Sequence, residues 1–306
     1  MEQIPTELDH LLEHSLNDPQ WPTLEGYLEE YYQQLGSQGD GLKTYFPVFD
    51  TALEGLRGIV IVGGEPGSGK TALALQIGFD SAIDQRPVVI YSFEMPKTQL
   101  VTRFFQRAGK IGYRKMQSSF DDLLEDKRFV TAQERIKHAA GRIMIRETKD
   151  FFSKADGGSI TAVFDFSEQI RQLNSITDQY KTPPLVIIDS LHEIPVDPKN
   201  SRDLKQKIDF IMLNLRNMCD QTGATFLLIS HQSRSGQKEG GLSSFLGSAS
   251  IEYTVDMALT IAVPSGDGAR EEDRELIVAK NRYGPKPKAI LDFDGKHMDF
   301  TFIDML

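Results

Sequence analysis

The segment GGEPGSGKT, residues 63–71, constrains the fold of this chain more than any other feature. It follows the apolar, β-branched run IVIV (59–62), which predicts a buried strand, and it leads into TALALQIGF (71–79), which predicts a helix. A strand, a glycine-rich loop and a helix in this order make the phosphate-loop pattern G-x-x-x-x-G-K-T. The glycines let backbone N–H groups turn toward a phosphate, and the helix N-terminus adds a partial positive charge. The pattern predicts a nucleoside triphosphate site, with an ordinary glycine-rich turn as the alternative.

The loop also predicts which side chains touch the nucleotide. Lys70 is expected to reach the β- and γ-phosphates, and the Thr71 hydroxyl is expected to ligate Mg²⁺. The predicted cofactors are therefore ATP and Mg²⁺. The predicted binding residues are Gly64, Glu65, Pro66, Gly67, Ser68, Gly69, Lys70 and Thr71.

Composition narrows the class of protein. The 306 residues are 40% hydrophobic and 25% charged, which is ordinary for a soluble globular chain. No apolar run approaches the ~20 residues of a membrane span, and the N-terminus lacks the pattern of a secretory leader, so we expect a cytoplasmic protein with no membrane contact. Cys219 is the single cysteine, which excludes an internal disulfide, and we expect it to be a packing residue. The net charge of −10 argues against a dedicated duplex-DNA binder but leaves open a basic channel between subunits.

The chain divides into two predicted parts. Residues 1–40 are acidic and carry leucines at helical spacing, which predicts a helical N-terminal extension ending in the flexible linker GSQGDG (36–41). This extension either packs on its own core or docks on a neighbouring subunit or a protein partner. Residues 41–306 are expected to form one ATPase domain.

Strands and helices alternate through this second part. Helices between strands imply right-handed crossovers, a mostly parallel sheet and helices on both of its faces. The last three predicted strands follow one another closely and therefore predict an antiparallel edge. After the strand at 59–62, the predicted strands are 88–93, 142–147, 183–191, 224–230, 255–263, 274–281 and 288–295, with helices at about 96–108, 130–140, 165–180 and 202–222.

Two carboxylates end predicted strands. Asp189 closes the run LVIID, where the crevice of an open α/β sheet lies, and is a candidate second anchor for Mg²⁺; a helix-capping role is the alternative. Glu94 follows VVIYSF and is a candidate base that polarises a water for attack on the γ-phosphate; an ordinary solvated strand end is the alternative.

Three segments resemble a known family. VVIYSFEMPKTQLVTRF (88–104) resembles the "SLEM" segment of bacterial replicative helicases of the DnaB type. GSASIEYTVDMAL (247–259) resembles that family's Gly-Ser/Ala-Ile-Glu segment, and AKNRYGP (279–285) resembles its K-x-R-x-G-P segment and the KNRFG of RadA-type ATPases. The resemblance runs from about residue 45 to the end. It implies a RecA-like P-loop fold of the DnaB, RadA and KaiC group.

The resemblance also implies catalytic roles. Glu94 becomes the catalytic base and Asp189 the Walker B acid, while Lys280 and Arg282 become a finger that reaches the γ-phosphate of the neighbouring subunit. Spacing agrees, because two cations one residue apart share a face of a strand and together can stabilise phosphoryl charge; ordinary surface charges are the alternative. His231 falls where the family has a γ-phosphate-sensing Gln, and would add a pH dependence; a loop-capping His is the alternative.

Two predicted loops bear on the identity of the polymer substrate. The loops after the Walker B and sensor strands, 195–203 and 233–245, are expected to line a central channel, where Arg234 and Lys238 are candidates for contacting single-stranded DNA. The leading hypothesis is a homo-oligomeric, hexameric ring motor on single-stranded DNA, a DnaB-like helicase without the family's N-terminal collar domain. The alternative is a RecA-fold ATPase that regulates a protein partner and does not translocate.

Overall fold

The computed structural model describes residues 41–154, 160–230, 249–264 and 270–306, together with Leu24, Leu28, Tyr31 and Tyr32. The chain divides into two compact units, Met1–Asp40 and Gly41–Leu306. In the first unit the four described residues are helical. Within the described ranges, no helix is long and apolar enough to cross a bilayer.

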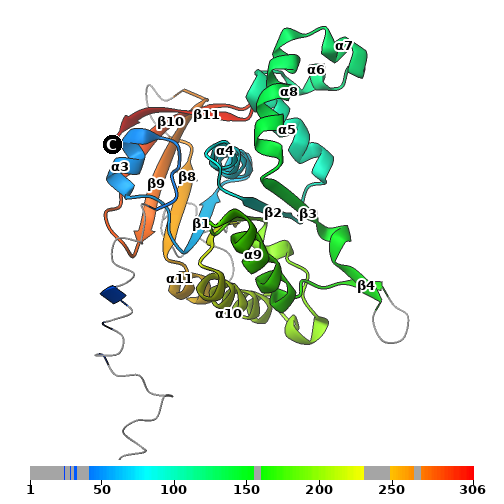
Figure 1. The fold of residues 1–306 in the computed structure, drawn as a ribbon. Helices are drawn as coiled ribbons and strands as arrows, with labels where there is room; N and C mark the ends of the chain where they lie inside the picture. The colour runs from blue at the N-terminus through cyan, green and yellow to red at the C-terminus, as the bar shows by residue number, and fades with distance from the viewer. Residues whose placement is uncertain are drawn as a thin grey trace, which may run out of the picture. The chain divides into compact units, whose positions relative to one another are not determined.

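A nine-stranded sheet organises the described part of the second unit (Figure 1). In spatial order its strands are β11 (Asp299–Met305), β10 (Lys288–Asp294), β9 (Asp273–Asn281), β8 (Met257–Ala262), β1 (Ile59–Gly64), β7 (Thr225–Ile229), β6 (Leu185–Asp189), β2 (Val88–Ser92) and β3 (Ile143–Glu147). The strands from β8 to β3 run parallel, whereas β8, β9, β10 and β11 pair antiparallel. The predicted parallel sheet with an antiparallel edge is confirmed.

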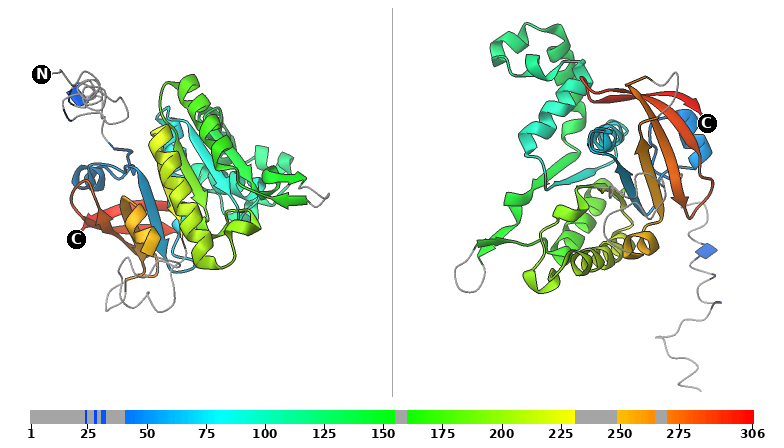
Figure 2. Two further views of the ribbon diagram at one scale, coloured as in Figure 1. Left: turned by 90° about the horizontal axis from the view of Figure 1, so that it is seen from below. Right: turned by 180° about the vertical axis from the view of Figure 1, so that it is seen from behind.

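Helices cover both faces of this sheet (Figures 1 and 2). One face carries α4 (Lys70–Ile83), α5 (Lys97–Gly109) and α8 (Lys127–Ala140). The other carries α9 (Phe166–Tyr180), α10 (Leu204–Thr222) and α11 (Ala249–Thr254). Among the described residues, two large apolar clusters, one on each face, form most of the core. Because both faces are covered, β1, β2 and β6 are buried at every position, which explains their nearly continuous apolar sequences.

Parallel pairing places the ends of three strands along one edge. β1 ends at Gly64, β2 at Ser92 and β6 at Asp189, and Ser92 is the register partner of Asp189. Loops that leave this edge carry the phosphate-loop segment and both strand-end carboxylates. The crevice beyond the carboxyl ends of the strands is therefore where a ligand is expected.

Some elements were not predicted from the sequence. They include α3 (Pro47–Leu53), the short helices α6 (Tyr113–Met116), α7 (Phe120–Leu124) and α11, the small hairpin of β4 (Phe152–Lys154) and β5 (Ile160–Ala162), and the edge strand β11. Most are only three to seven residues long, so their apolar periodicity extends over too few positions to stand out. β11 carries a period-2 signal in Phe300 and Phe302 that the sequence analysis missed.

Candidate active site

The phosphate loop joins β1 to α4 through backbone conformations that favour glycine. Gly64, Gly67 and Gly69 have φ values of 152°, 82° and 100°. At Gly69 a Cβ atom would lie 2.6 Å from the ring of Phe300, so close packing also requires a glycine there. Around Gly67, by contrast, no described atom lies within 4 Å of the Cβ position. The loop is packed from behind and open at its centre.

Lys70 lies across this loop. Its ammonium group donates to the carbonyl oxygens of Gly64 and Glu65, both over 2.9 Å. Burial lowers the pKa of Lys70 below its ordinary value, while the nearby carboxylates of Asp189 and Glu94 act in the opposite direction. An anionic ligand would stabilise the charge of this buried cation, because the carbonyl groups that bind it are neutral.

Thr71 and Asp189 meet beside the loop. The Thr71 hydroxyl donates to Oδ2 of Asp189 over 2.9 Å, although the residues lie 118 positions apart. The Asp189 side chain is buried, and its backbone carbonyl accepts from the Phe93 amide over 2.7 Å. The carboxylate therefore faces the first turn of α4, and does not serve as a helix cap.

The carboxylate of Glu94 lies at the tip of the neighbouring strand. It accepts a hydrogen bond from the hydroxyl of Ser190, the residue after Asp189. Glu94 is itself exposed and lines the same cleft as Lys70 and Thr71. The two strand-end acids thus lie on one side of the loop, with Glu94 the more accessible to water.

The cleft around these groups has a volume of about 360 Å³. Arg103 of α5 lines it; burial lowers the pKa of this arginine, and the charge of Asp189 opposes the effect. Three residues at or after the end of β10 also line it: Phe293, Gly295 and Met298. None of these four was predicted from the sequence. Arg103 follows Glu94 by nine residues in a helical pattern, and no local pattern singles it out.

The donor set beside the loop is compatible with Mg²⁺. Among the described residues, no group of three or more His, Cys, Asp or Glu side chains could hold a metal ion. A hydroxyl and a carboxylate, those of Thr71 and Asp189, are hard oxygen donors already within hydrogen-bond distance of each other. Magnesium typically binds one or two such protein oxygens and takes the rest of its ligands from phosphates and water. These two residues therefore fit the predicted ion.

Lys280 and Arg282 lie elsewhere. Lys280 donates to the carbonyl oxygen of Glu252 over 2.6 Å, and Arg282 donates to that of Tyr253. Both cations thus contact α11. β9 ends at Asn281, so the expectation that they share one strand is wrong for Arg282, which lies one residue past its end. β9 is also not the edge strand, because β10 and β11 lie outside it.

Strand register separates these cations from the cleft of their own chain. Lys280 pairs with Ala258 in β8, whereas Gly64 pairs with Ile261. The two positions are three residues apart along β8, roughly 10 Å, and the phosphate loop continues away from Lys280. Neither cation lines the cleft of its own chain. His231, Arg234 and Lys238 lie outside the described residues.

A phosphate loop at the carboxyl edge of a parallel sheet, with two acids on the adjacent strand ends, defines a P-loop α/β protein. Residues 41–302 match the family model described as the DnaB-like helicase C terminal domain, and the chain belongs to this family. A solved ATPase domain shares its fold, with a TM-score of 0.74 at 20% identity over 93% of this chain and 100% of that one. The structure of a DnaB-like replicative helicase matches with a TM-score of 0.71 at 20% identity, over 96% of this chain and 70% of that one.

Two curated relatives are similar in sequence. The probable replicative DNA helicase of Trieres chinensis is 24% identical over 273 residues, which cover 85% of this chain and 57% of that protein. The replicative DNA helicase DnaB of Mycoplasma genitalium is 27% identical over 279 residues, or 83% of this chain and 54% of that protein. The chain thus spans little more than half the length of these relatives. The RecA-like fold expected from the sequence is confirmed.

Proposed function

We propose that this chain is an ATP-hydrolysing motor domain that works in the cytoplasm as a homo-oligomeric ring on single-stranded DNA. The observation that carries the proposal is the contact between Thr71 and Asp189 beside an open phosphate loop. It joins the first turn of α4 to the end of β6, where a hydrolysing P-loop protein holds its metal–triphosphate substrate.

Each group in the cleft then has a role. The loop amides around Gly67 and Gly69 and the Lys70 ammonium bind the phosphates, and Thr71 with Asp189 holds Mg²⁺, which neutralises phosphate charge when bound. Glu94 orients a water and accepts its proton, a task suited to an exposed carboxylate at the rim of the cleft. Arg103 adds a second cation to the lining of the cleft.

The remaining cations support a ring. Lys280 and Arg282 lie at the opposite end of β8 from the phosphate loop, so they can reach a γ-phosphate only in another subunit. Rings of identical subunits repeat one such heterologous contact at every interface. We propose a hexamer, with residues 41–306 as the ATPase domain and residues 1–40 as an extension that docks on a neighbouring subunit or a protein partner.

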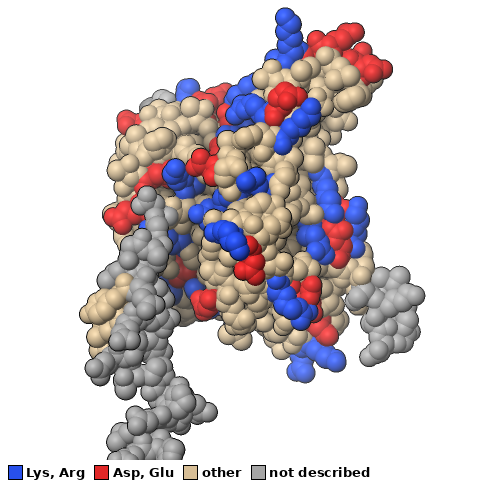
Figure 3. Space-filling model, in the orientation of Figure 1, with Lys and Arg blue, Asp and Glu red and all other residues tan. Residues whose placement is uncertain are grey.

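Single-stranded DNA is the proposed substrate because the relatives are replicative DNA helicases. Arg234 and Lys238, which follow β7 in the sequence, are the proposed contacts. One observation favours the second candidate, an ATPase that regulates a protein partner. The net charge is −10, and basic and acidic side chains are interspersed over the face shown in Figure 3.

The test measures ATP hydrolysis in Mg²⁺ at low salt, with and without a single-stranded oligonucleotide, and with Lys70→Ala as the inactive control. Stimulation of the wild type by DNA supports the motor. Hydrolysis that DNA leaves unchanged, together with no DNA binding in the presence of ATP, would select the regulatory ATPase. Absence of nucleotide binding would reject both.

A further inference from the structure

The turn between β10 and β11 forms one wall of the cleft. Phe293, Gly295 and Met298 line the cleft there, and Lys70, Glu94 and Asp189 line it elsewhere. The ring of Phe293 stacks on that of Phe300, with centroids 4.4 Å apart. An apolar surface offers no donors to a phosphate, so this wall suits the nucleoside part of a bound nucleotide.

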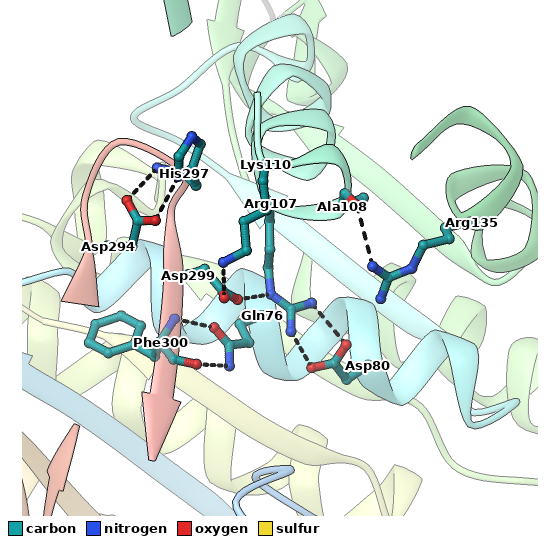
Figure 4. A network of polar contacts seen from close by, with 10 residues as sticks. All are labelled: Gln76, Asp80, Arg107, Ala108, Lys110, Arg135, Asp294, His297, Asp299 and Phe300. Carbon is teal, nitrogen blue, oxygen red and sulfur yellow. Dashed lines mark hydrogen bonds and ion pairs between the residues drawn. The ribbon is translucent and has the colours of Figure 1, made fainter. Parts of the chain in front are cut away.

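One face of α5 holds this turn in place (Figure 4). The Gln106 side chain donates to the carbonyl oxygen of Lys296 over 3.1 Å. Nε of Arg107 donates to Oδ1 of Asp299 over 2.8 Å, and Lys110 forms an ion pair with the same carboxylate. Gln106, Arg107 and Lys110, which caps the end of α5, follow at helical spacing from Arg103, which lines the cleft. One helix and its cap therefore support both a cation in the cleft and its apolar wall.

Arg107 makes a second, bidentate contact. Its Nη1 and Nη2 atoms donate to the two carboxylate oxygens of Asp80 in α4 over 2.8 and 2.7 Å (Figure 4). The side chains of Arg107, Asp80 and Asp299 are only 16%, 19% and 15% exposed. A single guanidinium thus joins α4, α5 and the start of β11. Burial opposes its charge, but the hydrogen bonds that it donates to Asp80 and the charges of both carboxylates outweigh this effect and raise the pKa of Arg107.

The rest of β11 is held independently of Arg107. The Gln76 amide of α4 donates to the Phe300 carbonyl over 3.0 Å and accepts from the Phe300 N–H over 2.8 Å. Loss of Arg107 should therefore leave β11 in the sheet. It would leave Asp80 partly buried without a cation and Asp299 with Lys110 alone, and the weakened hold on these two carboxylates would displace the turn at its Asp299 end.

We propose that Arg107 is a positioning residue that holds the β10–β11 turn against the nucleotide cleft and thereby sets affinity for the nucleoside part of the ligand. The inference rests on the proposed nucleotide site, but it concerns a different end of that site. It predicts that loss of Arg107 affects the binding of two related ligands differently. Arg107 contributes to binding of a nucleoside diphosphate and contributes nothing to binding of the diphosphate alone.

The experiment compares Mg²⁺-ADP with Mg²⁺-pyrophosphate by isothermal titration calorimetry in the full chain. Arg107→Ala should weaken ADP binding about tenfold or more and leave pyrophosphate affinity unchanged. Arg107→Lys keeps a charge but cannot span both carboxylates, so it should show the same asymmetry to a smaller degree. Arg107→Ala combined with Asp299→Asn should recover part of the lost affinity, because one of the carboxylates that lost Arg107 is then uncharged.

Arg135→Ala is the matched control. Arg135 also contacts α5, donating to the Ala108 carbonyl over 3.3 Å, but it does not touch the turn (Figure 4). The Arg135→Ala variant should bind ADP as the wild type does. Equal losses of ADP and pyrophosphate affinity, or no loss of either, in Arg107→Lys would overturn the inference. A wild type that binds pyrophosphate as tightly as ADP would overturn the inference alone, and one that binds neither would overturn the proposed function as well.

Discussion

Arg282 donates to Oδ1 of Asp256 over 3.1 Å, and the other oxygen of that carboxylate is bound separately. Oδ2 accepts from Arg216 over 2.9 Å and from the backbone amide of Ile59 over 2.8 Å. The Asp256 side chain is only 3% exposed, so its buried carboxylate needs a cation or a hydrogen-bond donor at all times. Arg216 and Ile59 supply this, and Arg282 can therefore leave for a neighbouring subunit without leaving a buried charge unpaired.

This arrangement predicts that ATP hydrolysis in one subunit requires a neighbouring subunit. Arg282→Ala should bind nucleotide normally and lose about 10³–10⁵-fold in turnover, the usual value of an arginine finger. Mixing it with Glu94→Gln should restore part of the activity, because a mixed interface can combine an intact base with an intact finger. Arg171→Ala, which changes an exposed arginine paired with Glu168 in α9, is the control and should remain active. Full activity in dilute monomer, with no recovery on mixing, would show that the cation does not act between subunits.

Lys70 and Glu94 should separate binding from hydrolysis. Lys70→Ala removes the cation held over the loop and should abolish nucleotide binding. Glu94→Gln preserves the shape and should bind nucleotide while losing about 10²–10⁴-fold in rate, as general bases typically contribute. Binding by calorimetry and turnover by phosphate release measure the two effects. Wild-type turnover in Glu94→Gln would assign the base to another residue.

Neutralising Arg234 and Lys238 together should weaken single-stranded DNA binding to a similar extent for all sequences, because phosphate contacts carry no base information. The slope of affinity against salt concentration should also become flatter. Fluorescence anisotropy with oligonucleotides of different sequence, over a salt series with ATP and Mg²⁺, measures both. An unchanged slope would place the DNA contacts elsewhere.

Cys219 should report unfolding. Burial raises the pKa of its thiol from 9.0 to about 11. At pH 8 the fraction of Cys219 present as thiolate should therefore be about 100-fold lower in the native protein than in the unfolded chain. A thiol reagent should react slowly with native protein and rapidly in denaturant. The native state keeps a proton that the unfolded state loses between pH 9 and 11, so stability should fall by about 3 kcal/mol across that range. Replacing Cys219 with Ala should remove this part of the pH dependence, and rapid native labelling would contradict the burial.

The sequence predicted the parts of the site that local patterns encode. The loop, Lys70 and Thr71 lie in one motif, and Asp189 and Glu94 each end an apolar strand, so chain order and parallel pairing bring them to one edge. Arg103 and Phe293 were missed because only tertiary packing brings their helix and strand to the cleft. The contacts of Arg107 with Asp80 and Asp299 likewise join residues 27 and 192 positions away, and no local spacing encodes them.

The position of β1 has a consequence for synthesis on the ribosome. Val62 pairs with Ile229 and Gly64 with Ile261, so the strand that carries the loop is made well before either of its two neighbours in the sheet. Phe300, which packs against Gly69, is made later still. Until those segments leave the exit tunnel, the emerging chain cannot hold the loop in shape, because non-local pairing must come first. ATP in the cell therefore cannot assist folding before β11 has been made, and it can stabilise only a chain whose synthesis has passed that strand.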